Sequence, residues 1–314
     1  MSTRRWDEVP VGAPLGPGSL LWSTAGDPRS LLTGSTAGIM QLMLPGLGAG
    51  VTDHSNFFDD PFDRIFRSIP AIWGTIFVSD DEGDEPDRRG RSIRDLHTEI
   101  KGTDEQGRGY HALDPEVFWW AHATFTWEML RARELYFAVP LRRAQQEQLY
   151  AECVTWFRRY GVSERAMPPD LTTFEARFEE ICLTELEITP AVAWVLDPGE
   201  NSAARSDPIT LPGVLRPLSP MASKANAQVV RLFVYGAMPD SLRRRFGFSW
   251  SNADRLEYAG LAAALRAAGP AVKRGALSGI WPEGTPHLEP GSHHRVIKAG
   301  PSIAQRRVDT SDAA

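Results

Sequence analysis

The stretch DPEVFWWAHATFTWEMLRARELYF, residues 114–137, carries the clearest structural signal in the chain. The Asp114 side chain can accept hydrogen bonds from the free amides at a helix start, and Pro115 suits the first helical position. Glu116 follows where the positive end of the helix dipole stabilises an acid. Apolar residues then recur as far as Phe137. The stretch therefore predicts one long helix that runs to about Phe137.

Working outward, helical patterns cover most of the remaining chain, whereas strand-like alternation is nearly absent and no repeat of fixed period is visible. An acidic run followed by arginines over 79–91 predicts a solvated connection, and the polar residues 103–110 predict a loop. The further helices are expected at 30–44, 60–76 with a kink at Pro70, 91–101, 141–160, 172–185, 190–196, 219–235 and 252–268.

These patterns predict an all-α fold with a single globular helical domain over residues 29–270. Residues 1–28 are rich in proline and glycine, so we expect an irregular N-terminal arm. From Trp281 onward the sequence lacks apolar periodicity, and residues 271–314 are expected to form a flexible tail.

The composition, 42% hydrophobic and 24% charged over 314 residues, is that of an ordinary globular protein. A net charge of −6 without a long basic stripe argues against nucleic acid as a partner. Only Cys153 and Cys182 occur, which excludes a disulfide scaffold and paired-cysteine metal sites. The N-terminus shows no export signal, and the apolar stretch 36–51 is too short to span a bilayer. We therefore expect a cytoplasmic protein.

His122 is the first candidate for chemistry. Phe118, His122, Phe125 and Met129 are spaced four, three and four residues apart, so they share one face of the predicted helix. Burial on that face favours the neutral imidazole, which is the form that binds a metal. The alternative is a core histidine hydrogen-bonded to a backbone carbonyl, and the spacing does not decide between the two.

A second polar face precedes that helix. Arg94, His97, Thr98 and Lys101 lie at offsets of three, four and seven residues, so they face one way on a helix. Such a face is usually solvated, but a fixed cation, an imidazole and a hydroxyl together could orient a bound oxygen species or an anion.

Other motifs are weaker. Zinc is the competing metal, but His97, His111 and His122 lack HExxH or paired-cysteine spacing. The sequence has no GxSxG, GxGxxG or GxxxxGK[ST] motif, and Cys153 is expected to be packed rather than nucleophilic. His54 stands at a loop between two apolar helices, and the tail histidines 287, 293 and 294 are expected to be solvated.

Four stretches, taken in order, resemble the DUF2236 family of oxygenase MpaB-type proteins, which is related to the catalytic domain of rubber oxygenase, the latex clearing protein. The resemblance covers about residues 30–265, and its central block is the most specific part. The stretches are DHSNFFDDPFDRIFRSI (53–69), SIRDLHTEIKG (92–102), YHALDPEVFWWAHATF (110–125) and the region from LPGVLRPLSP (211–220) to RLFVYGAMPDSLRRRFGFSW (231–250).

The resemblance implies a globin-like, all-α core that binds haem b, with His122 as the proximal iron ligand. Rubber oxygenases carry a distal Arg–x–x–Lys–Thr element, which Arg94, His97 and Thr98 match with histidine in place of lysine. His97 could therefore ligate the iron or donate a hydrogen bond to dioxygen. Phe118 would form part of the apolar wall around the macrocycle.

The resemblance leaves other roles less defined. Phe125 would also line the cofactor, and Arg94 could pair with a haem propionate or polarise an oxygen intermediate. The carboxylate base of the rubber oxygenases has no motif match, although Asp80 and Asp81 lie in the corresponding part of the chain.

The leading hypothesis is a haem b-dependent oxygenase that oxidises a small apolar substrate with dioxygen. The resemblance to the rubber oxygenases implies an isoprenoid as a possible substrate. One alternative is a non-catalytic haem protein for sensing, storage or electron transfer, in which His97 and His122 both bind iron. The other is a haem-free helical binding protein in which both histidines are core groups.

Overall fold

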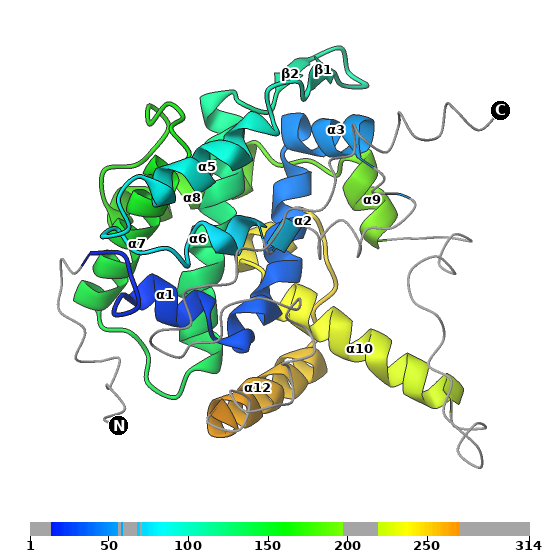
Figure 1. Cartoon of the computed structure of the whole chain (residues 1–314). Helices are drawn as coiled ribbons and strands as arrows, with labels where there is room; N and C mark the ends of the chain where they lie inside the picture. Colours follow the sequence, from blue (N-terminus) through cyan, green and yellow to red (C-terminus); the bar gives the residue numbers. More distant parts are fainter. Residues whose placement is uncertain (1–13, 56–57, 59–67, 70, 197–218, 270–314) are drawn as a thin grey trace, which may run out of the picture.

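The computed structural model describes residues 14–55, 58, 68–69, 71–196 and 219–269. Its central element is α6, Pro115–Tyr136, which begins as the sequence predicts. The Asp114 side chain accepts a hydrogen bond from the Glu116 amide at 2.9 Å, and Pro115 occupies the first turn. The long helix expected from the sequence is thus confirmed, and it runs through the middle of the molecule (Figure 1).

Helices from both ends of the chain cover α6. The N-terminal elements α1 (Leu20–Ala25), the 3-10 helix η2 (Pro28–Thr33) and α2 (Gly34–Met43) pack against it, as do α7 (Arg143–Arg158) and α12 (Asn252–Ala267). The main buried cluster lies where α1, α2, α6, α7 and α8 (Leu171–Thr184) meet. This arrangement places the middle of α6, with His122, in the core.

The all-α prediction is confirmed. The helices after α6 lie close to their expected positions because capping residues and prolines mark their ends: α7, α8 (Leu171–Thr184), α9 (Pro190–Leu196), α10 (Ser219–Ala237) and α12. The short α11 (Asp240–Arg245), which follows Pro239 directly, was not predicted. In Figure 1, α10 and α12 lie at the opposite end of the molecule from the hairpin formed by β1 (Lys101–Thr103) and β2 (Gly109–His111).

The expected single helix over 30–44 is wrong. The chain forms η2 and α2 there. α2 ends at Met43, just before Pro45, and Pro45 itself starts a further helix, α3 (Pro45–His54). Leu44 is extended between α2 and α3, which lets Pro45 occupy a first helical turn.

The expected irregular arm over 1–28 is wrong in its last part. Leu20–Ala25 forms α1, and every residue of this helix is buried. Ser19 caps it by accepting a hydrogen bond from the Trp22 amide at 3.2 Å. Residues 1–13, the tail 271–314 and most of the expected helix 60–76 with its kink at Pro70 lie outside the described residues.

The expected helix at 91–101 starts earlier and ends sooner. It is α5, Glu85–Asp95, and it takes in much of the acidic and basic run that predicted a solvated connection. Ion pairs of Glu85 with Arg89 and of Asp87 with Arg91 lie four residues apart and support a helix. The helical spacing of these opposite charges therefore explains why the segment is a helix and not the expected solvated connection.

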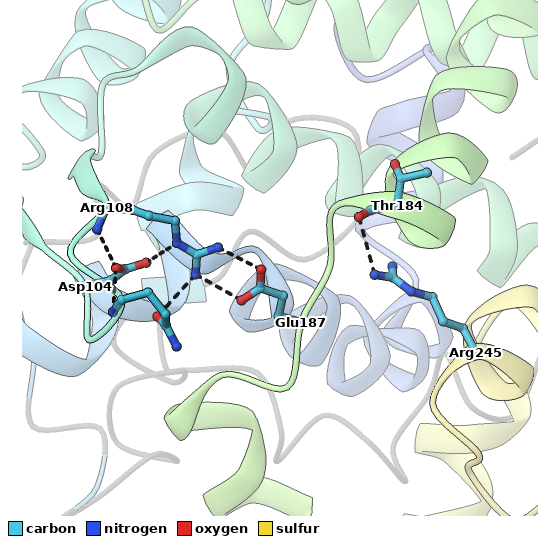
Figure 2. Close-up of polar contacts among 6 residues, drawn as sticks. Asp104, Arg108, Thr184, Glu187 and Arg245 are labelled. Atoms are coloured by element: carbon cyan, nitrogen blue, oxygen red, sulfur yellow. Dashed lines mark hydrogen bonds and ion pairs between the residues drawn. The ribbon is translucent and has the colours of Figure 1, made fainter.

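A small hairpin replaces the end of that expected helix and the loop after it. Strand β1 (Lys101–Thr103) pairs antiparallel with β2 (Gly109–His111). Figure 2 shows Arg108 of the hairpin loop between Asp104 and Glu187, with 2.7 Å from Arg108 Nη1 to Glu187 Oε1. The same figure shows Arg245 bonded to the Thr184 carbonyl at the end of α8. These contacts fix the hairpin and α11 to the segment around α8.

No helix in the described ranges is long and apolar enough to cross a bilayer.

Candidate functional site

The His122 side chain lies in the core between α6 and α7. It is 3% exposed, and its Nε2 atom lies 2.9 Å from the Cys153 carbonyl oxygen. Because a carbonyl oxygen can only accept a hydrogen bond, Nε2 carries the ring proton and donates a hydrogen bond to the Cys153 carbonyl. The ring is therefore held by a backbone group of α7, one turn before that helix ends at Arg158.

Aromatic rings surround the His122 imidazole. Trp156, Phe157 and Tyr160 present their rings with centroids 4.6, 5.1 and 5.9 Å from that of His122. All three come from α7 or the turn directly after it. The imidazole is thus enclosed by an apolar wall on the α7 side.

Burial decides the protonation state of His122. Desolvation lowers the pKa of this imidazole to about 3, and the hydrogen bond to the Cys153 carbonyl opposes the change only in part. The ring is therefore neutral at physiological pH. A neutral imidazole is the form that can bind a metal ion.

The second ring nitrogen of His122 shows whether this residue could hold a metal ion. Nδ1 is buried and has no hydrogen-bond partner. With the proton on Nε2, Nδ1 carries a free lone pair. A histidine that donates one N–H to a carbonyl and keeps the other nitrogen free has the donor arrangement of a metal-binding imidazole. The hydrogen bond to Cys153 also matches the core-histidine alternative, so His122 as iron ligand stays a prediction.

Arg94 and Thr98 lie at the surface end of α5 and in the turn after it. Nε and Nη2 of Arg94 donate to Asp95 Oδ1 at 2.9 and 2.7 Å. The Thr98 hydroxyl donates to the Asp95 carbonyl at 2.9 Å, and Thr98 is exposed. In the described residues, no contact joins Arg94 or Thr98 to His122. Their catalytic role stays a prediction.

His97 approaches the core more closely. Its Nδ1 donates to the Ile93 carbonyl at 2.8 Å, and its ring lies edge-on to Phe118, with 5.9 Å between centroids. Phe118 in turn contacts Tyr160, at 5.3 Å. Since Tyr160 also contacts His122, Phe118 and Tyr160 form a chain of rings that links the two histidines.

Phe125 lies on the other side of His122 along α6. Its ring centroid is 5.7 Å from that of Trp73 and 6.0 Å from that of Trp156. Both predicted wall residues, Phe118 and Phe125, therefore border the aromatic cluster that contains His122. Whether they line a cofactor stays a prediction.

Asp80 is one of the two acids in the part of the chain where the rubber oxygenases carry their carboxylate base. Its carboxylate is hydrogen-bonded within the protein. It accepts a hydrogen bond from Arg159 Nη2 at 2.5 Å and one from the Leu15 amide at 2.9 Å. Arg159 is buried and also donates to the Thr75 carbonyl. Asp80 therefore ties the N-terminal segment to the end of α7. Asp81 is exposed.

The remaining candidates also have ordinary partners. His54 Nε2 lies 3.2 Å from the Lys101 carbonyl, and His111 Nε2 lies 3.3 Å from that of Thr98. The free thiols of Cys153 and Cys182 are buried, and burial raises the pKa of both. In the part of the chain described, no three His, Cys, Asp or Glu residues are grouped to hold a metal ion.

Sequence reasoning missed a buried acid on α6. Glu128 is 1% exposed, and its Oε1 has no hydrogen-bond partner. Desolvation raises its pKa well above the usual value. The side chain lies beside α2, since a Cβ built on Gly34 would be 3.3 Å from Oε1. The available signal was an acid among the apolar residues in the middle of α6.

Glu128→Gln is expected to change how stability depends on pH. The folded chain holds a proton on Glu128 above pH 4.5, where the unfolded chain releases it, so the wild-type free energy of unfolding falls as pH rises. The amide does not titrate. We expect the variant to match wild type near pH 4.5 and to be about 1–3 kcal/mol more stable at pH 8. Urea unfolding at both pH values measures this.

Glu134→Gln is the control, because Glu134 lies on the same helix with its side chain 62% exposed. It makes the same carboxylate-to-amide change at an exposed position, so it reports the effect of the substitution without burial. Equal behaviour of the two variants would show that the Glu128 carboxyl is not desolvated.

A family model described as "ER-bound oxygenase mpaB/B'/Rubber oxygenase, catalytic domain" matches residues 22–267. The match begins within α1 and ends with α12, so it includes His122 and the face with His97. Comparison with curated proteins and comparison with solved structures each gave no match. The globin-like core implied by the resemblance therefore stays a prediction.

Proposed function

The chain belongs to the family of the ER-bound oxygenase mpaB/B' and rubber oxygenase catalytic domains and is an oxygenase; we propose that it works with haem b, whose iron His122 holds. The observation that carries this proposal is the buried, neutral His122 ring with one nitrogen bonded to Cys153 and the other unpartnered. An iron ligand must offer such a lone pair, and burial keeps protons from competing for it.

The bound haem would supply an iron centre able to react with dioxygen. The chain would supply the orientation of the ligand and a dry surrounding. The Cys153 carbonyl fixes the rotation of the His122 ring and makes the imidazole a stronger donor. Trp156 and Phe157 cover the ring and exclude water from it.

Phe118 and Phe125 are our proposed apolar walls of the cofactor site. Each borders the aromatic cluster around His122. Their position, one turn before and one turn after His122 on α6, supports this role.

We propose that three polar side chains orient bound dioxygen: Arg94, His97 and Thr98. Arg94 is also the proposed partner of a haem propionate. The family match and the motif support these roles, and the edge contact between His97 and Phe118 supports that of His97. To act, Arg94 and Thr98 have to exchange their bonds to Asp95 for others. We propose a small apolar substrate, with isoprenoids as the first class to test. The printed description of the family names rubber oxygenase, which supports this choice.

Haem titration tests the proposal. Haemin added to the purified protein is expected to give a Soret band that saturates at equimolar haem and to raise the unfolding temperature. Rapid cyanide binding would indicate an open iron position, as an oxygenase requires. Slow binding would favour the non-catalytic haem protein with both His97 and His122 on the iron. Absence of a Soret band and of any stabilisation would contradict haem dependence and leave His122 as a core histidine.

A further inference from the structure

Arg133, near the end of α6, is a buried cation that the proposed oxygenase site does not use. The residue is 3% exposed, and its Nε atom is buried without a hydrogen-bond partner. Within the described residues, no carboxylate lies within ion-pair distance of its guanidinium. Because an unpaired buried charge is strongly unfavourable, such a group calls for a compensating anion.

A second guanidinium lies beside it. The Arg29 and Arg133 guanidinium carbons lie 4.0 and 4.4 Å from the centroid of the Phe137 ring. The ring stabilises both cations through its electron-rich face. Phe137 thus holds two fixed positive groups in a small, largely buried volume.

The neighbouring acid is bound to Arg29. Asp27 Oδ1 accepts from Arg29 Nε at 2.9 Å, and Asp27 Oδ2 accepts from Arg29 Nη2 at 2.8 Å. Burial lowers the pKa of Arg133 to about 10, and the nearby Arg29 charge adds to this while Asp27 opposes it. Asp27 therefore acts on Arg133 only from a distance.

Capping of the helix end does not explain Arg133 either. Cations often bond to the free carbonyls in the last turn of a helix. Here the Tyr136 carbonyl accepts from Arg29 Nη1 at 2.9 Å, and the Glu134 carbonyl accepts from Arg266 Nη2 at 3.2 Å. Two other arginines thus satisfy these carbonyls.

We propose that Arg133, with Arg29 and Phe137 beside it, binds an oxyanion that has two oxygen atoms on one centre, the carboxylate or phosphate group of a small molecule. A guanidinium presents N–H groups in a planar fork that matches two such oxygens. The site does not depend on haem, and it lies three helical turns from His122 along α6.

Calorimetric titration of the full chain with sodium acetate and with sodium phosphate tests the site, with sodium chloride at matched ionic strength as the reference. Wild type is expected to bind acetate, phosphate or both, and not chloride. Arg133→Gln is expected to bind about 10- to 100-fold more weakly, the loss of a charge-assisted pair. Arg88→Gln makes the same charge change at a side chain that is 70% exposed. It should bind like wild type.

Arg133→Lys is the second variant, to be used if Arg133→Gln does not fold. Lysine keeps the positive charge and the aliphatic stem of the side chain. It lacks the planar fork and is expected to bind about 10-fold more weakly than wild type. Acetate binding alone would assign a carboxylate, and phosphate binding alone a phosphate group. The proposal is overturned if neither anion binds beyond chloride, or if Arg133→Lys binds as tightly as wild type.

Discussion

His122→Ala is expected to purify without haem and to lose about 3–5 kcal/mol of stability, the usual cost of removing a buried aromatic side chain. Two losses add. The cavity removes the ring contacts with Trp156 and Phe157, and the buried Cys153 carbonyl loses its donor. The measurements are the Soret absorbance after haem titration and the free energy of unfolding in urea.

His122→Phe separates the two effects. Phenylalanine fills the space but has no nitrogen, so this variant is expected to fold better than His122→Ala and still fail to bind haem. Full haem binding by His122→Phe would show that His122 is not the iron ligand. His97→Ala would then be the variant expected to lose haem binding.

The same variant tests the burial of the imidazole through pH. The unfolded chain protonates His122 below its usual pKa of 6.5, whereas the folded chain resists protonation down to about pH 3. Wild-type stability should therefore fall as pH decreases from 6.5 toward 3, and His122→Phe should remove that part of the fall. An unchanged acid profile would show that His122 is accessible to protons.

Gly90→Ala is expected to destabilise the protein by about 3 kcal/mol, the upper range for overpacking. A Cβ built on Gly90 would lie 2.0 Å from the Arg159 carbonyl oxygen and 2.8 Å from the Tyr160 amide nitrogen. Both are backbone atoms that cannot rotate away, so α5 has to move off the end of α7. The bond from Arg94 to the Gly161 carbonyl would be lost with that movement.

Gly38→Ala is the matched control. Gly38 is also helical, but a Cβ built there meets nothing within 4 Å. Alanine should raise helix stability at this position by roughly 0.5–1 kcal/mol. Thermal unfolding of both variants provides the comparison. A Gly90→Ala variant as stable as wild type would mean that α5 does not pass close to the α7 end.

Local signals in the sequence predicted most of the helices after residue 114. Asp114, Pro115 and the apolar spacing define α6, and α9 has the predicted bounds. These signals act within a few residues, so they can be read without knowledge of the fold. Before α6 the prediction was poorer. Leu44 is extended before Pro45, so the chain turns there and a new helix starts. The acidic and basic residues whose ion pairs support α5 were interpreted as a solvated connection.

The sequence alone determined that His122 lies on a buried helix face, because helical spacing fixes which side chains share a face. Only the tertiary structure decided what the ring meets: the Cys153 carbonyl on one nitrogen and no partner on the other. Likewise, the arginines of α6 look alike in sequence, yet Arg131 bonds to Glu134 while Arg133 is buried beside Phe137. The Cys153 carbonyl lies 31 residues from His122 along the chain, and Arg29, which shares the Phe137 ring with Arg133, is also distant in sequence, so local sequence carries no record of these neighbours.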